Sequence, residues 1–241
     1  MESAVLDRGV QAYGDPMDLG LSGRVAVVVG GTGYIGRAIA DRLRAEGATV
    51  LTASRSGGDV RIDGADRASV EAGVATVLRE HGHVDVLVVT AAPPADSLDP
   101  SSLSDPDTVL DAVGGKAMTF LRLANAVLPT MRAAGHGRVV AVSGQNAYFT
   151  GNIAGSVRNA ALSVVAKNLA DEHVGSGVTV NVVNPGTVAD TPSTEVEPAR
   201  GGESSPGQIA ALIAFLASDD AAAISGESIS TGHKVRGIAT T

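Results

Sequence analysis

Five short apolar runs, rich in β-branched residues, constrain the fold of this chain more than any other feature. They cover residues 24–29, 48–53, 84–90, 137–143 and 178–184. Between them lie stretches with apolar residues at helical spacing, such as 35–43, 70–78 and 209–216. Strands that alternate with helices indicate βαβ units, whose right-handed crossovers place helices on both faces of a parallel sheet. The sequence therefore predicts an α/β fold with a doubly wound parallel sheet in a three-layer sandwich.

Length and composition narrow the function classes. A chain of 241 residues suits one domain, predicted over residues 21–241 after a flexible N-terminal tail over 1–20. The net charge of −8 and the 2% aromatic content argue against nucleic-acid and membrane partners. The chain has no cysteine, and its five histidines lack metal-ligand spacing, so no metal site is expected. The N-terminus does not resemble a signal peptide, which favours a soluble, cytoplasmic protein.

A glycine-rich segment joins the first predicted strand to the first predicted helix. It reads GGTGYIG over residues 30–36. Glycines allow a tight turn and close approach of a pyrophosphate, and the following helix N-terminus offers free N–H groups. This context predicts a Rossmann-type dinucleotide site, although a plain strand–helix turn is the alternative. The predicted contacts are Gly30, Thr32, Gly33, Tyr34 and Ile35.

The end of the second predicted strand bears on cofactor choice. An NAD site generally has an acidic residue there, which binds the ribose hydroxyls. This chain instead has Ala53, Ser54 and Arg55. Ser54 can bond a 2′-phosphate and Arg55 can pair with it, so NADP(H) is favoured over NAD(H). The alternative is that Arg55 is only a solvated surface charge.

Several motifs together resemble the short-chain dehydrogenase/reductase family over nearly the whole chain. They are the glycine segment, residues 62–63, 85–92, 127–143 and 184–191, and the run 206–227, which is similar to the family's last helix and strand. The resemblance implies a small-molecule substrate and a homodimer or homotetramer built on the fourth and fifth helices. It also implies further cofactor contacts at Ile62, Asp63, Ala91, Ala92, Pro185, Gly186 and Val188.

The family's catalytic Ser, Tyr, Lys and Asn do not occur at their usual positions. In the family, Tyr is the acid or base, Lys binds the nicotinamide ribose, Ser orients the substrate and Asn holds a water. Alignment puts Asn159 at the Lys position, Gly155 at the Tyr position and Lys116 at the Asn position. We hypothesise that Lys116 and Asn159 have exchanged roles, with Lys116 also contacting the cofactor. The alternative is drift after loss of catalysis.

The substitute proton donor is open at this stage. The usual Ser position is Gly144, but Ser143 is adjacent, and Gln145 and Tyr148 follow it. Ser143 and Gln145 can donate hydrogen bonds to a carbonyl, and Tyr148 is a candidate acid. Tyr148 can equally be apolar pocket wall.

A Pro-, Gly- and Ser-rich segment over residues 190–206 is expected to be a substrate loop or lid, or else a plain surface connection. The function that these features favour is an atypical NADP(H)-dependent oxidoreductase. Two alternatives stay open: a non-redox enzyme (cyclase, dehydratase or isomerase) on the same fold, and a non-catalytic nucleotide-binding or partner subunit.

Overall fold

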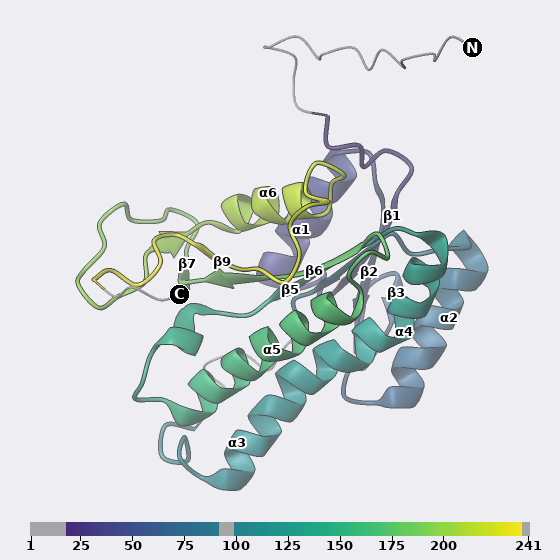
Figure 1. Ribbon diagram of the computed structural model, residues 1–241. Helices are drawn as coiled ribbons and strands as arrows, with labels where there is room; N and C mark the ends of the chain where they lie inside the picture. The colour runs from purple at the N-terminus through teal and green to yellow at the C-terminus, as the bar shows by residue number, and fades with distance from the viewer. Residues whose placement is uncertain (1–17, 92–98, 238–241) are drawn as a thin grey trace.

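A parallel sheet forms the centre of the molecule. The computed structural model describes residues 18–91 and 99–237, and within them the sheet has seven strands in the order β3-β2-β1-β4-β5-β6-β9 (Figure 1). This order confirms the predicted doubly wound sheet, with its switch point between β1 and β4. The strands are β1 (Val25–Val29), β2 (Thr49–Ser54), β3 (Val60–Arg61), β4 (Val86–Val89), β5 (Gly137–Val142), β6 (Val178–Pro185) and β9 (Ser228–Thr231).

Helices cover both faces of this sheet, as predicted. Helices α1 and α6 lie on one face, and α2, α4 and α5 lie on the other (Figure 1). Helix α3 packs against α5 and is joined to α4 by a π-helical turn, Gly114–Met118. The helices are α1 (Tyr34–Ala45), α2 (Arg67–His81), α3 (Pro106–Val113), α4 (Thr119–Ala134), α5 (Ile153–Glu172) and α6 (Pro206–Leu216).

The period of two along each strand divides the core between the two faces. In β1, Val25, Val27 and Val29 pack against the α2–α4–α5 layer, whereas Ala26 and Val28 pack against α1 and α6. All five residues are buried, which explains why the strand is apolar throughout rather than alternating.

Two boundaries differ from the sequence-based expectation. Leu19 is buried in the core beside α1 and α6, so the packed chain begins before residue 21, inside the predicted tail. The last strand, β9, lies at 228–231, just beyond the run 206–227 that the resemblance assigned to the last helix and strand. Three of its four residues, SIST, are polar and the strand is only partly buried, so it lacks the apolar signal of a central strand.

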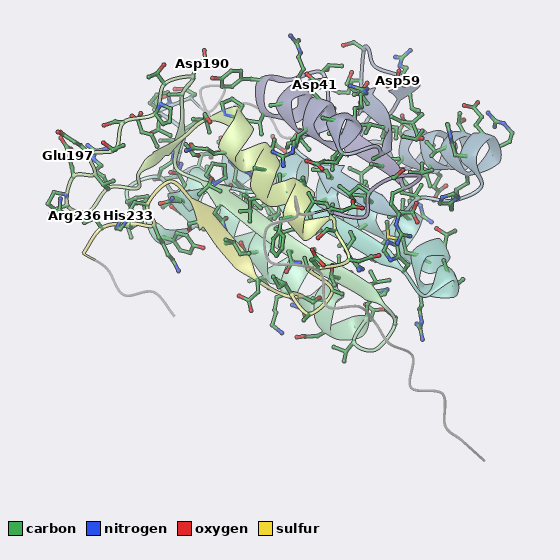
Figure 2. All side chains as sticks on the ribbon, turned by 90° about the horizontal axis from the view of Figure 1, so that it is seen from above. Asp41, Asp59, Asp190, Glu197, His233 and Arg236 are labelled. Atoms are coloured by element: carbon green, nitrogen blue, oxygen red, sulfur yellow. The ribbon has the colours of Figure 1, made fainter. Side chains whose placement is uncertain are left out.

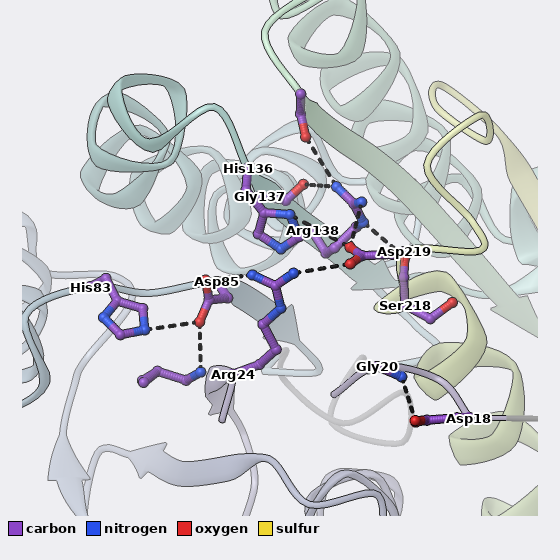
Figure 3. A network of polar contacts seen from close by, with 12 residues as sticks. Asp18, Gly20, Arg24, His83, Asp85, His136, Gly137, Arg138, Ser218 and Asp219 are labelled. Carbon is purple, nitrogen blue, oxygen red and sulfur yellow. Dashed lines mark hydrogen bonds and ion pairs between the residues drawn. The ribbon is translucent and has the colours of Figure 1, made fainter. Parts of the chain in front are cut away.

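A polar network ties the strands together at their amino ends (Figure 3). Asp85 accepts a hydrogen bond from the Val25 amide at 2.8 Å and lies 3.5 Å from the Arg24 guanidinium. Arg24 also pairs with Asp219 at 3.0 Å, and the buried Arg138 reaches the same carboxylate at 3.2 Å. Arg138 further donates to three backbone carbonyls at 3.0 Å, those of Gly137, Gly177 and Ser218.

The segment predicted as a loop, residues 190–206, is held by backbone hydrogen bonds. Its end forms β8 (Glu203–Ser204), which pairs in parallel with β7 (Thr187–Val188) outside the main sheet. The Gly202 amide donates to the His233 carbonyl at 2.7 Å, and the Ala199 amide donates to the Arg236 carbonyl at 2.9 Å. In Figure 2, Glu197, His233 and Arg236 lie together at one end of the molecule. The C-terminal segment therefore anchors this loop.

Across residues 18–91 and 99–237, no helix combines the length and apolarity needed to cross a membrane. The same residues contain no cluster of three or more His, Asp or Glu with the arrangement of a metal site.

Candidate active site

The glycine segment forms a tight turn at the carboxyl ends of β1 and β4. Gly30 has a φ of +85°, and a side chain there would overlap with Thr90 and approach the Ala91 amide to 2.8 Å. A side chain at Gly36 would overlap with the Gly30 carbonyl. The turn therefore requires glycine both for its backbone conformation and for the close packing of β1, β4 and α1.

The N-terminus of α1 opens from this turn toward solvent. Gly33 is its N-cap residue and provides no side chain to bind the first N–H groups, and Thr32, Gly33 and Tyr34 are exposed. Uncapped N–H groups at a helix N-terminus suit the pyrophosphate of a dinucleotide. The Tyr34 hydroxyl donates to Asp190 at 2.5 Å, and this hydrogen bond raises the pKa of Tyr34. Tyr34 thus also ties the glycine turn to the start of the 190–206 loop.

Arg55 and Ser54 lie at the end of β2, on the predicted adenine side. Arg55 is exposed, whereas the Ser54 hydroxyl closes a turn with Gly57, donating to its carbonyl at 2.6 Å and accepting from its amide at 2.9 Å. Sequence reasoning missed Asp59, which follows β2 in the chain and lies beside that strand. Its carboxylate accepts from the Thr52 amide and hydroxyl, both at 2.8 Å, and these bonds lower its pKa. Asp59 is therefore engaged by β2 itself.

The remaining predicted cofactor contacts, around β3 and β4, differ in their burial and in their hydrogen bonds. The Ile62 side chain is buried in the core, so only its backbone faces the site. Asp63 caps a local turn by accepting from the Ala65 amide at 3.0 Å. Ala91 lies against the glycine turn, donating to the Val29 carbonyl at 3.2 Å. Ala92 lies outside the described residues.

A cavity of about 400 Å³ lies beside the glycine turn, at the carboxyl ends of β5 and β6. Its wall includes Ile35 from α1. It also includes four residues that the sequence analysis assigned to the site: Lys116, Ser143, Gln145 and Asn159. The predicted nicotinamide contacts Pro185, Gly186 and Val188 line it as well. The structure therefore brings the predicted cofactor loop and most of the predicted catalytic residues to one cavity.

Lys116 is enclosed in the wall of this cavity. It lies in the π-helical turn between α3 and α4 and is only 6% exposed. Its Nζ donates to the Ser143 carbonyl at 3.1 Å. Burial, and then the nearby positive charge of Arg158, lower the pKa of Lys116 from 10.5 to about 7.

Asn159 reaches the same point from α5. The Ser143 hydroxyl donates to the Asn159 carbonyl at 3.2 Å and to its side-chain Oδ1 at 3.3 Å. Ser143 thus links Lys116 and Asn159, the two positions that appeared exchanged in the sequence. The proximity on which the exchange hypothesis depends is present, although the roles themselves stay a hypothesis.

The family model for short chain dehydrogenases matches residues 24–200. The chain belongs to the short-chain dehydrogenase family. Among its curated relatives is a 3-oxoacyl-[acyl-carrier-protein] reductase of Escherichia coli, 29% identical over 88% of this chain and 96% of that protein. A short-chain reductase protein, NovJ of Streptomyces niveus, is 34% identical over 85% of this chain and 91% of that protein. The solved structure of gox2181 superposes with a TM-score of 0.76 at 23% identity, over 88% and 95% of the two chains, which supports the fold.

In this short-chain dehydrogenase, Gly155 is the residue predicted at the family's tyrosine position. Gly155, which aligns with the family's Tyr, lies in the first turn of α5, and its amide donates to the N-cap side chain of Asn152 at 2.7 Å. A side chain at Gly155 would meet the Asn152 amide group at 2.9–3.0 Å. The space beside Gly155 is therefore filled by the helix cap.

Two predicted proton or hydrogen-bond donors do not serve the cavity. The Tyr148 side chain does not line it, because its hydroxyl lies 3.5 Å from Ser228 Oγ and accepts from Asn184 at 3.4 Å. Gln145 does line it, but its Nε2 donates to the Thr231 and His233 carbonyls at 3.1 and 3.2 Å. Tyr148 as acid and Gln145 as donor to a substrate stay predictions, which these contacts do not support.

Sequence reasoning missed two charged cavity residues of the dehydrogenase, Arg158 and Arg200. Arg158 is only 4% exposed, and burial lowers its pKa. It is the only charged residue in the first fourteen residues of α5, a signal that could have identified it. Arg200 comes from the 190–206 loop, so only the folded loop places it at the cavity.

Proposed function

We propose that this short-chain dehydrogenase is an NADP(H)-dependent reductase of small-molecule carbonyl compounds. The observation that carries the proposal is the glycine turn, in which Gly30 and Gly36 admit no side chain and the uncapped α1 N-terminus opens beside the 400 Å³ cavity. A bound reduced nicotinamide supplies the hydride for such a reaction. The names of the relatives add a first substrate class, 3-oxoacyl thioesters.

The chain's own residues have separate parts in this proposal. The α1 N-terminus binds the pyrophosphate, and Pro185, Gly186 and Val188 border the nicotinamide. Lys116 provides a cation beside Ser143, where the family's Lys is missing. The loop over residues 190–206 brings Arg200 to the cavity and excludes water from it.

The preference for NADP(H) rests on Arg55. It is exposed at the end of β2, and the nearby acid, Asp59, is bonded to Thr52 instead of facing a ribose. Arg55→Glu is expected to weaken NADPH binding by roughly ten- to a hundred-fold, because it removes a charge-assisted contact and adds repulsion. NADH binding should change little. Arg79→Glu, on the exposed end of α2, is the matched control.

The test combines binding with turnover. NADPH and NADH are titrated by nicotinamide fluorescence, and absorbance of the reduced nicotinamide is followed with a 3-oxoacyl thioester, a short aldehyde and a cyclic ketone. NADPH binding with oxidation by one of these carbonyls is the expected result. Binding without turnover favours a non-redox enzyme or a nucleotide-binding subunit. Failure of both nucleotides to bind contradicts the interpretation of the glycine turn.

A further inference from the structure

Lys116 has hydrogen-bonding capacity left over at the cavity. A lysine ammonium has three N–H donors. Among the hydrogen bonds of the described residues, Lys116 Nζ makes one, to the Ser143 carbonyl at 3.1 Å. Because Lys116 also lines the cavity, a ligand oxygen placed there can accept from the same nitrogen.

The surroundings of Lys116 do not favour its charged form. Helices α3, α4 and α5 pack against its turn. From α5 comes the positive charge of Arg158, which opposes protonation of the amine. From α4, Arg122 donates to the Gly64 carbonyl at 3.4 Å, and the acids of α3, Asp107 and Asp111, are exposed to solvent. No ion pair to Lys116 exists within residues 18–91 and 99–237.

We propose that Lys116 is the proton donor that replaces the family's tyrosine. This inference rests on the proposed reductase function. As the hydride of the reduced nicotinamide is added to the carbonyl carbon, the Lys116 ammonium gives one proton to the carbonyl oxygen. The products are an alcohol, the oxidised nicotinamide and a neutral Lys116 amine, which then takes a proton from water. In the reverse direction, the neutral amine accepts the proton of the alcohol.

Other groups near the cavity are less suited to this role. The Tyr148 hydroxyl points to Ser228 and Asn184, and the Gln145 donors are bonded to backbone carbonyls. The Ser143 hydroxyl donates to Asn159, and an arginine such as Arg158 keeps its proton at any physiological pH. A general acid works best when its pKa is close to the operating pH, and burial brings the pKa of Lys116 to about 7.

The acidity of Lys116 can be measured without a substrate. The chain has only three lysines, Lys116, Lys167 and Lys234, so lysine labelled with ¹³C and ¹⁵N gives three side-chain signals. The signal that disappears in Lys116→Met belongs to Lys116. We expect it to titrate near neutral pH. A titration of Lys116 above pH 9.5 overturns the proposal.

Kinetics separate proton donation from a fixed positive charge. With the carbonyl that the wild type reduces, Lys116→Arg keeps the charge but has no proton to give, so kcat should fall by about 10²- to 10⁴-fold. NADPH affinity should stay within roughly three-fold of wild type, because the cation is retained. Wild-type kcat for reduction should fall as pH rises through about 7. Added ethylamine should restore part of the activity of Lys116→Gly.

The outcomes distinguish the two proposals. Full turnover by Lys116→Arg shows that Lys116 serves only as a charge, and it overturns the proton-donor role while leaving the reductase function intact. A wild-type protein that binds NADPH and reduces none of the three carbonyls contradicts the reductase function instead. Lys167→Met, which removes an exposed lysine of α5, is the control and should keep wild-type kcat.

Discussion

Burying Lys116 has a thermodynamic cost at the scale of one residue. A tenfold change in proton affinity is worth about 1.4 kcal/mol, and the pKa of this amine is lowered from 10.5 in an unfolded chain to about 7. Between these values the unfolded chain binds the proton and the folded chain does not, so stability falls as pH falls from about 10.5 to 7. Residues that serve a site often reduce stability in this way.

Lys116→Met should therefore stabilise the fold. We expect its free energy of unfolding at pH 7 to exceed that of wild type by about 2–4 kcal/mol, because the variant has no amine proton to release on folding. The advantage should shrink toward pH 10, close to the unfolded-state pKa of 10.5, because releasing that proton on folding then costs little free energy. Urea unfolding at pH 7, 8.5 and 10 measures it. An advantage that is equal at all three values contradicts the depressed pKa.

At the scale of elements, α1 and the 190–206 loop share one exposed contact, between Tyr34 and Asp190. Tyr34→Phe removes its hydroxyl and keeps the ring. The amides of residues 187–192 should then exchange with deuterium roughly two- to five-fold faster, since an exposed hydrogen bond contributes little. Tyr148→Phe, whose hydroxyl makes only long contacts near β9, should leave these amides unchanged. Equal exchange in wild type and Tyr34→Phe would show that the C-terminal segment alone anchors the loop.

The amino ends of the strands depend on Arg138 of β5. It is 3% exposed and donates to three carbonyls and to Asp219, so Arg138→Met leaves several acceptors without a donor. We expect a loss of about 2–4 kcal/mol in the free energy of unfolding, measured by urea titration. Arg79→Met, which removes an arginine paired on the exposed side of α2, should cost little. If both variants lose the same stability, the network is not what holds this end of the sheet.

At the scale of the whole molecule, α5 presents a stripe of apolar residues on its outer side. Ile153, Val157 and Val164 lie four and seven residues apart, and Val164 is 62% exposed. We expect this stripe to lie at the contact between copies of the chain, as the homodimer or homotetramer prediction requires. Val164→Glu should shift the mass in size-exclusion chromatography with light scattering toward the monomer. Val174→Glu, at a more exposed position beyond α5, should not. A wild-type monomer contradicts the prediction.

The sequence predicts the sheet better than it predicts the site. Strands β1, β4, β5 and β6 are buried on both faces, so runs rich in β-branched residues identify them. The two-residue strands β3, β7 and β8 carry no such pattern. Within the site, the glycine turn could be predicted because the glycines that it requires are close together in the sequence. The orientation of Gln145 and Tyr148 depends on β9 and the C-terminal segment, which only tertiary structure brings to them.

The helix cap at Asn152 bears on how this site can change over time. Its side chain fills the space next to Gly155, so a tyrosine placed there would have to displace the group that begins α5. A single substitution would weaken the helix before it supplied a phenol, and Asn152 would have to change as well. A phenol at this position therefore requires two coordinated substitutions.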